Sequence, residues 1–373
     1  MPPNFESSAT IAASVLETRP RPAASKANAA ALDARLNSAP GARQPLVWYN
    51  IVLLGLYHSV AVASVLAGVF SWKMYIFMYV YAQIGGLGVT AGVHRLWSHR
   101  AYKARRPLRY LLAVFFSVAG QNTILNWVRD HRVHHKFTET DADPHNAKRG
   151  FFFAHCGWLL QRKHPDVYSQ GAKVDLSDVE SDPVVQWHTR NFRLLKFIFC
   201  LVVPTLIPVY CWGETWTIAV VTCVTRLVIL INLTWLVNSA AHLYGTHPYD
   251  KRINPTENAL VSALSNGEGW HNYHHIFPWD YKASEHKYLN FTTVFLDQFV
   301  RIGWAYDLKS ASPDLVARVA LRHGDGSHPK HGVEEHFQEV PYDEYLRILK
   351  DDDELTGVRD LHNAEDPTRQ RVA

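Results

Sequence analysis

The stretch "LVWYNIVLLGLYHSVAVASVLAGVF", residues 46–70, contains no charged side chain. It is long enough to cross a bilayer as a helix, which takes about 20 apolar residues. A second apolar stretch, "MYIFMYVYAQIGGLGVTAGV" at residues 74–93, follows after the tripeptide "SWK". Because so short a connection makes two helices antiparallel neighbours, the two stretches predict a hairpin of membrane-spanning helices.

The same arrangement recurs at "LLKFIFCLVVPTLIPVYCW" (residues 194–212) and "WTIAVVTCVTRLVILINLTWLVNSAA" (residues 216–241), separated by "GET". Arg226 would cost about 2.5–3.5 kcal/mol at the bilayer centre, so we expect its side chain to face the helix bundle or the membrane surface. The stretch "LLAVFFSVAG" at residues 111–120 is too short to span and is expected in the membrane interface. The sequence therefore predicts an all-α integral membrane protein with four transmembrane helices as two hairpins, carrying a cytosolic helical cap.

Two hairpins place both chain ends and the long segment 94–193 on the same side of the membrane. Lysine and arginine are abundant in that segment, so the positive-inside rule makes this side cytosolic. We expect residues 1–44 to form a disordered cytosolic tail, residues 45–310 to form the membrane domain, and residues 311–373 to form a polar cytosolic tail. The formal net charge of +4 gives no sign of nucleic-acid binding. The cysteines have no disulfide or zinc spacing and are expected to be reduced; they are Cys156, Cys200, Cys211 and Cys223.

The histidine pattern HxxHH occurs twice, as "HRVHH" at residues 131–135 and as "HNYHH" at residues 271–275. On a helix, residues three and four positions apart share one face, so the imidazoles of each pattern can reach a common metal site. "HRLWSH" at residues 94–99 adds two histidines whose five-residue step suits one α-helical face badly, so we expect the helix to end or bend between them. "NSAAH" at residues 238–242 adds an asparagine and a histidine at the end of the fourth span.

These segments supply nine candidate imidazole ligands, more than the four that fill a tetrahedral zinc site, so two metal ions are predicted. The candidates are His94, His99, His131, His134, His135, His242, His271, His274 and His275. Imidazole suits several metals, but an apolar bundle that feeds a cytosolic metal cluster favours iron and the oxidation of lipid chains. Nearby carboxylates can accept the second N–H of a ligand ring and fix its orientation; the candidates are Asp130, Asp141, Asp143 and Glu268. Asp130 and Glu268, one and three residues from a ligand, are favoured.

Three of these segments resemble the histidine boxes of the membrane acyl-CoA desaturases of the stearoyl-CoA (delta-9) type. They are "GVHRLWSHRAYKA", "NWVRDHRVHHKFTETDADPHNAKRGFFFAHCGWLL" and "GEGWHNYHHIFPWDY", and the resemblance extends over residues 45–310. It implies that the protein inserts a cis double bond into a saturated fatty acyl-CoA in the endoplasmic reticulum membrane. It further implies two iron ions, molecular oxygen, and electrons from cytochrome b5 with its reductase. The chain contains no "HPGG" haem-binding stretch, so the donor is expected to be a separate protein.

The resemblance also implies roles for individual residues. It makes the nine histidines metal ligands and lets Asn238 approach one metal through water. It implies acyl-CoA contacts, where cationic side chains suit the phosphates of CoA, at Asn50, Asn122, Arg129, Asp130, Arg162 and Lys163. It implies a bent apolar acyl tunnel lined by Gln121, Trp127, Thr234 and Trp235. The closed end of the tunnel is expected at Ala82, Gly85 and Gly86, where small residues suggest a deep pocket.

Two other functions remain open from the sequence. A fatty-acid hydroxylase or alkane monooxygenase also carries histidine clusters on a membrane bundle, and analysis of the reaction product separates it from a desaturase. A histidine-rich metal transporter belongs to another class and would place its ligands within the spans rather than at their cytosolic ends.

Overall fold

The computed structural model of the protein describes residues 44–331. The tail expected over residues 1–44 lies outside the described residues apart from Gln44, as does the part of the expected C-terminal tail beyond residue 331. The first half of the described chain contains α2 (Trp48–Leu66), α3 (Trp72–Leu87), the π-helix η1 (Gly88–Ser98), β1 (Lys103–Ala104), α4 (Arg106–Ala119), α5 (Ile124–Lys136), η2 (Ala147–Arg149), the π-helix η3 (Phe153–Gly157), α6 (Trp158–Leu160), α7 (Pro165–Gly171) and α8 (Ser177–Glu180). The second half contains α9 (Pro183–Lys196), the π-helix η4 (Phe197–Val202), α10 (Val203–Trp212), α11 (Trp216–Asn238), α12 (Ala240–Leu243), α13 (Ala259–Leu264), α14 (His271–Ile276), α15 (Phe291–Arg301), β2 (Ala305–Tyr306) and α16 (Pro313–His323).

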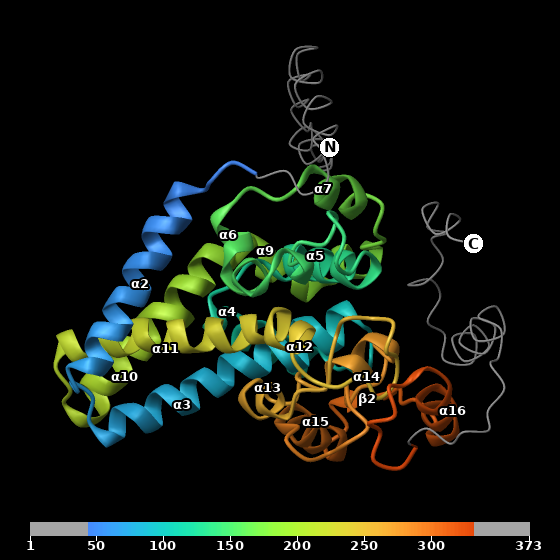
Figure 1. Ribbon diagram of the computed structural model, residues 1–373. Coiled ribbons are helices and arrows are strands. Elements are labelled where there is room, and N and C mark those ends of the chain that lie inside the picture. The colour runs from blue at the N-terminus through green and yellow to red at the C-terminus, as the bar shows by residue number, and fades with distance from the viewer. Residues whose placement is uncertain (1–43, 332–373) are drawn as a thin grey trace, which may run out of the picture. The chain divides into compact units, whose positions relative to one another are not determined.

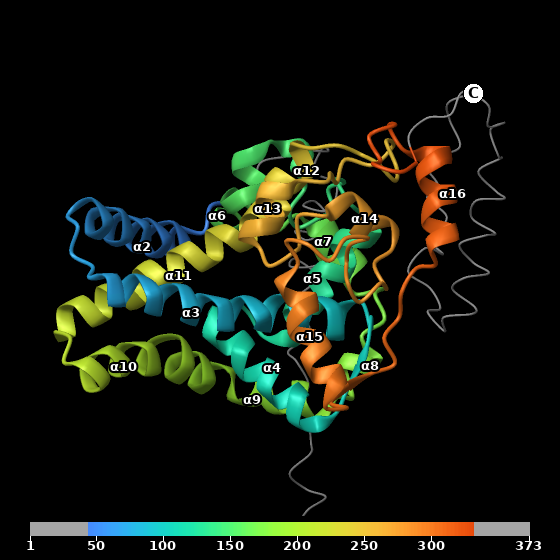
Figure 2. The ribbon, with the colours of Figure 1, turned by 90° about the horizontal axis from the view of Figure 1, so that it is seen from below.

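Four helical stretches are long and apolar enough to cross a membrane. They are Trp48–Leu66, Trp72–Ser98, Pro183–Trp212 and Trp216–Leu243. Figures 1 and 2 show α2, α3, α10 and α11 reaching toward one end of the described chain, where the two short connections lie. The predicted pair of hairpins is confirmed. The third span is longer than expected because α9 and η4 continue into α10 without a break.

The outer surface of these helices is apolar. Only 6% of the apolar stretch in α2 is buried, and large side chains such as Leu56 and Leu66 are exposed. In water such a surface would favour association with other apolar surfaces, whereas in a bilayer it faces lipid. Trp72, Tyr210 and Trp216 are exposed near the two short connections, where amphipathic rings suit the membrane–water boundary.

Helix α4 lies across η1 and packs closely against it. Its C-terminal end is set by Gly120, which adopts a left-handed conformation with φ of 65°. Where the two elements cross, a Cβ atom at Gly88 would collide with the backbone of Phe116, so only glycine allows this approach. The segment expected in the membrane interface thus forms part of α4, and its inner face, including Leu112 and Phe116, is buried against the spans.

Buried polar contacts tie α11 to the elements around it. Arg226 is fully buried and donates to the carbonyl oxygens of Val118 (3.1 Å) and Cys200 (3.0 Å), which confirms that it faces the bundle. The four cysteines are free, as expected.

The remaining helices form a cap at the opposite end from the short connections (Figure 2). The folded chain extends past the expected boundary at residue 310, because Leu315 and Val319 of α16 are buried against Tyr249, Tyr273 and Phe277. Within this polar segment, the apolar residues of α16 recur at helical spacing and form one buried face. That face packs against α14.

Candidate metal centre and adjoining cavity

The nine histidines expected as ligands come together in two groups. The first group contains His94, His99, His131, His135 and His274, and the second contains His134, His242, His271 and His275. Within each group, one ring nitrogen per residue lies within 4.8 Å of all the others. Each HxxHH segment contributes to both groups, so α5 and α14 each supply candidate ligands to two neighbouring sites. This arrangement explains why the pattern occurs twice.

A π-helix resolves the awkward spacing of His94 and His99. The chain from Gly88 to Ser98 widens from α-helix into π-helix, and the amide of His99 donates to the carbonyl oxygen of His94 at 3.2 Å. Residues five positions apart nearly align in a π-helix, because its hydrogen bonds join i and i+5. The helix does end between the two histidines, at Ser98, but the wider turn brings their rings to 4.9 Å between centroids.

Three carboxylates orient ligand rings from behind. Glu268 lies 2.7 Å from Nδ1 of His94, Asp143 lies 2.9 Å from Nδ1 of His134, and Glu139 lies 3.2 Å from Nδ1 of His242. A ring that donates its Nδ1–H to a carboxylate presents an unprotonated Nε2 on its other side. Each carboxylate therefore points the lone pair of its histidine into the cluster.

One expected partner is corrected and one was missed. Asp130 pairs with Lys163 and Arg129 rather than with a histidine ring, because its side chain leaves α5 toward the segment after α6. Glu139 was not among the candidates, and its only sequence signal is its place in the acidic turn that follows "HRVHH".

Arg95 holds Glu268 in place. It is 1% exposed and donates to Oε1 of Glu268 from Nη2 at 2.8 Å, while Nη1 donates to Tyr281 and Thr293. Burial acts to raise the pKa of Glu268, but the charge of Arg95 and the hydrogen bonds donated by Arg95 and His94 outweigh it and hold that pKa below its usual value. Glu268 therefore stays ionised and available to accept from His94. Arg95 was not among the residues expected from the sequence, although it lies between the candidate ligands His94 and His99.

The donor set fits metal ions. Nε2 of His94 faces Nε2 of His274 at 2.9 Å, and Nε2 of His242 faces Nε2 of His271 at 3.0 Å. Burial, together with neighbouring imidazoles, holds the pKa of His271 and His274 well below the usual value, so both rings are neutral. Neutral imidazole nitrogens that converge in this way can serve as metal ligands, so each group could hold a metal ion.

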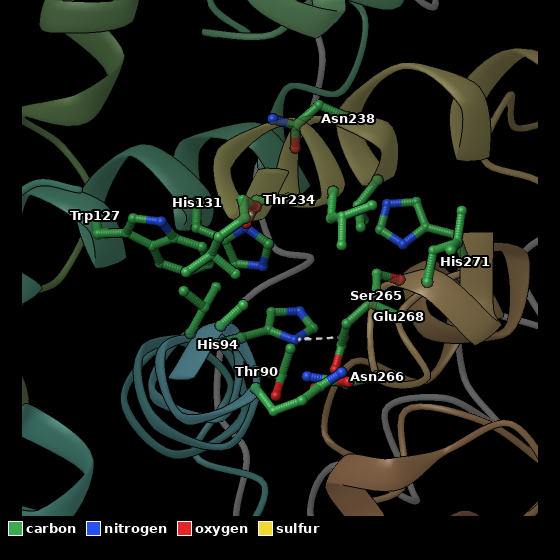
Figure 3. Close-up of a pocket in the computed structure, with 18 of the residues that line it drawn as sticks. Thr90, His94, Trp127, His131, Thr234, Asn238, Ser265, Asn266, Glu268 and His271 are labelled. Atoms are coloured by element: carbon green, nitrogen blue, oxygen red, sulfur yellow. Dashed lines mark hydrogen bonds and ion pairs between the residues drawn. The ribbon is translucent and has the colours of Figure 1, made fainter. Parts of the chain in front are cut away.

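A cavity opens directly beside the two groups. Its wall includes His94 and His131 of the first group and His134 and His271 of the second. Figure 3 shows His94 pointing toward the cavity between Trp127 and Glu268, with Asn238 above it and Thr90 and Asn266 below. The rest of the wall is mostly apolar and includes Ala82, Gly86, Val89, Leu230, Leu233, Val237 and Leu264.

Three of the expected tunnel residues form a connected bridge beside the first group. Gln121 accepts from Nε1 of Trp127 at 2.9 Å and donates to Oγ1 of Thr234 at 3.3 Å. The indole of Trp127 stacks on His131 with centroids 4.8 Å apart. Since Trp127 and Thr234 both line the cavity, the bridge supports the part of its wall that lies beside His131.

Two expected tunnel residues lie elsewhere. Trp235 is buried against Cys200, Leu227 and Ile231 and stacks on His58, because it points to the opposite side of α11 from the cavity. Gly85 packs against the side chain of Leu230 and the backbone of Ala119, and the cavity is lined instead by its neighbour Gly86.

The residues expected to contact acyl-CoA gather mainly where α5, α6 and the start of α2 meet. Lys163 pairs with Asp130, which also pairs with Arg129. The backbone of Arg162 donates to Pro45, and the side chain of Asn50 donates to the carbonyl oxygen of Leu159 at 2.7 Å. Arg162 is exposed, and together with Lys163 it lines a small surface hollow. Asn122 lies apart, exposed at the start of α5, where its side chain accepts from the amide of Thr123.

Comparison with known proteins gives consistent matches. The fatty acid desaturase family model matches residues 70–307. An acyl-CoA Delta-9 desaturase of Acheta domesticus is 52% identical over 291 residues, which cover 77% of this chain and 81% of that protein. An acyl-CoA Delta(11) desaturase of Spodoptera littoralis is 49% identical, covering 76% of this chain and 85% of that protein. An acyl-CoA Delta12-desaturase of Acheta domesticus is 52% identical, covering 77% of this chain and 82% of that protein.

Proposed function

The chain belongs to the fatty acid desaturase family, as a multi-pass membrane acyl-CoA desaturase, and on that premise we propose that it inserts a cis double bond at the delta-9 position of saturated fatty acyl-CoA. The reaction uses molecular oxygen and two electrons from cytochrome b5 and its reductase. The protein lies in the endoplasmic reticulum membrane with both termini in the cytosol. Family membership removes the metal transporter as an alternative.

One observation carries the proposal: an apolar cavity is walled by ligands of both histidine groups. An acyl chain in this cavity would lie beside both metal sites with its methylene groups out of water. The methylene groups of a saturated chain are chemically alike, so the pair that reacts is the pair that the protein holds beside the metals.

We propose two iron ions as the metals, one in each histidine group, with Asn238 approaching one of them through water. The irons would supply the redox chemistry that couples reduction of oxygen to removal of two hydrogens from the chain. The protein's own contribution is positional. Glu139, Asp143 and Glu268 fix the orientation of three ligand rings, and the apolar wall excludes water from the reacting carbons.

The CoA group is proposed to bind outside the cavity, at the cationic side chains of Arg129, Arg162 and Lys163. Guanidinium and ammonium groups form charge-assisted hydrogen bonds with phosphates. Asp130 holds Lys163 and Arg129 near one another, and Asn50 and Asn122 add neutral donors and acceptors. With the CoA end held there, the wall formed by Trp127 and Thr234 and supported by Gln121 determines which carbons reach the metals.

The delta-9 position is supported by the Acheta domesticus relative that carries this name, and relatives named for delta-11 and delta-12 desaturation are about equally similar. The position of the double bond in the product therefore tests the delta-9 proposal. We would express the protein in desaturase-deficient yeast and locate double bonds by mass spectrometry of derivatised lipids. A double bond at another carbon would reject the regiochemistry, and a hydroxylated product would reject desaturation itself.

The metal assignment has its own test. Purified protein should contain two irons per chain, and His135→Ala or His274→Ala should abolish turnover and lower the iron content. His286→Ala alters a histidine outside both groups and should retain both irons. One zinc per chain in an active preparation would contradict the assignment.

A further inference from the structure

A polar side chain faces the apolar cavity without a partner from the protein. Asn266 lines the cavity, and the residue is 7% exposed. Within residues 44–331, no side chain or backbone group hydrogen-bonds its amide, although its backbone carbonyl accepts from Thr292. Its neighbour Ser265 differs, because the hydroxyl of Ser265 donates to the carbonyl oxygen of Val261 at 2.6 Å.

The amide of Asn266 reaches the cavity because Gly86 has no side chain. A Cβ atom at Gly86 would lie 2.7 Å from Nδ2 of Asn266, so the amide occupies the space that a larger residue would fill. Gly86 and Ala82 mark the expected closed end of the acyl tunnel. The amide therefore lies in the half of the cavity that receives the methyl end of the chain.

Backbone geometry alone would also favour asparagine at this position. Asn266 has a φ of 61°, and asparagine tolerates this left-handed region better than most residues. Glycine tolerates it at least as well and would place no amide in the cavity wall. The conformation therefore accounts for the backbone of Asn266 but not for an amide that faces the cavity.

An amide offers two N–H donors and a carbonyl acceptor. A saturated chain that passes it displaces water from these groups and gives nothing in return, which is unfavourable. A chain with a hydroxyl group at the same depth satisfies donor and acceptor together. A buried site built to hydrogen-bond a ligand hydroxyl discriminates strongly against a ligand that lacks one.

Resting on the proposed function, we propose that Asn266 forms a hydrogen-bonding subsite for acyl chains that carry a hydroxyl group in their distal half. Such chains are bound and desaturated in preference to saturated chains of the same length. The subsite acts at one depth, so the preference depends on the position of the hydroxyl along the chain.

The test is a scan of hydroxyl position. Octadecanoyl-CoA and its isomers with a single hydroxyl at successive distal carbons compete with a fluorescent acyl-CoA for the purified full-length protein. The wild type should bind one isomer about tenfold more tightly than its neighbours, which corresponds to about 1.4 kcal/mol. The same isomer should be the preferred hydroxylated substrate in yeast membranes that supply the electron-transfer proteins.

Two variants remove the amide in different ways. Asn266→Gly keeps the backbone conformation, and Asn266→Leu keeps the side-chain size; both should flatten the scan while the saturated chain binds at least as well. Ser265→Ala should keep the maximum, because the hydroxyl that it removes is already bonded within the protein.

A flat scan in the wild type, or a maximum that survives in Asn266→Gly, overturns the subsite. If Asn266→Leu fails to fold, Asn266→Gly still decides. A flat scan with normal desaturation rejects the subsite alone, whereas a clear maximum in binding without any double bond in the product rejects the proposed function alone.

Discussion

Single side chains decide the chemistry of the metal centre by fixing which nitrogen of each ring is free. His242 illustrates this, because its Nδ1 lies 3.2 Å from Glu139 while its Nε2 lies 3.0 Å from Nε2 of His271. The carboxylate lies on the chain between α5 and η2, far from His242 in sequence, so the ligand is oriented by a separate segment. Loss of that contact would let the ring rotate without removing the ligand itself.

We therefore expect Glu139→Gln to weaken metal binding without unfolding the protein. The glutamine side chain is the same size as glutamate but lacks the negative charge that favours an Nδ1–H donor on His242. Losing such a partner typically lowers metal affinity by about 10–100-fold. Dialysis against a series of chelator concentrations, followed by metal analysis, would measure the change. Glu180→Gln, at an exposed carboxylate on α8, is the matched control and should retain metal as the wild type does.

The sequence predicted the nine ligand candidates because histidine spacing is visible along the chain. It also named Asp143 and favoured Glu268, which lie against His134 and His94, but it could not predict every carboxylate partner, since pairing depends on the fold. Asp130 is adjacent to His131 in sequence, yet on a helix consecutive side chains diverge, and Asp130 turns toward Lys163. Asp143 and Glu139 lie in a turn that folds back over the rings, so they reach His134 and His242 instead.

At the scale of elements, deviations from regular α-helix place the functional groups. The π-helix η1 aligns His94 with His99, and η4 exposes the carbonyl oxygen of Cys200, which accepts from Arg226 at 3.0 Å. Arg226 also binds the C-terminal end of α4 through Val118, where helix carbonyls lack partners within the helix. One buried guanidinium thus connects α11, η4 and α4.

Arg226→Met should therefore destabilise the bundle. Methionine has a similar length, but it leaves the carbonyl oxygen of Val118 without its donor, and an unsatisfied buried acceptor costs about 1–3 kcal/mol. Thermal unfolding in detergent micelles should show a lower midpoint. Arg193→Met is the comparison, because Arg193 is exposed near the end of α9. An equal midpoint in Arg226→Met and wild type would mean that apolar packing compensates for the lost hydrogen bonds.

The face of α3 that lines the cavity gives a second prediction at this scale. Ala82 and Gly86 lie one turn apart and both line the cavity, so Ala82→Tyr should fill its far end. Each excluded methylene removes about 0.8 kcal/mol of apolar burial, so longer chains lose affinity. Activity on a ladder of saturated acyl-CoAs should shift to shorter chains, with the double bond still counted from the carboxyl end. An unchanged chain-length profile in a folded variant would show that Ala82 does not limit the chain.

At the scale of the molecule, the four spans could be predicted because membrane crossing requires a long apolar run, and such runs are visible without any knowledge of packing. The cap was harder to predict. Residues after 310 have a polar composition, yet α16 buries Leu315, Val316 and Val319 on one face. A single amphipathic helix in a polar segment becomes interpretable only when the surface that it covers is known.

That covered surface includes the back of α14, which carries three of the candidate ligands. Tyr273 of α14 packs in the same cluster as Leu315, and its hydroxyl donates to Asp280 at 2.8 Å. The same carboxylate accepts from the hydroxyl of Ser310 and the amide of Ala311, both at 3.0 Å. The chain just before α16 is thus anchored to the helix that holds His271, His274 and His275.

Leu315→Ala should accordingly affect both stability and metal retention. Replacing a fully buried leucine by alanine costs about 2–5 kcal/mol, because apolar contacts are lost and a cavity remains. If α16 supports α14, the weakened cap also lets the ligand helix move, and metal should dissociate faster into excess chelator at a temperature where the variant is still folded. Arg318→Ala, on the exposed face of α16, should change neither the unfolding midpoint nor the rate of metal release. A lower midpoint with an unchanged rate of metal release would show that α16 stabilises its own surroundings without supporting the metal centre.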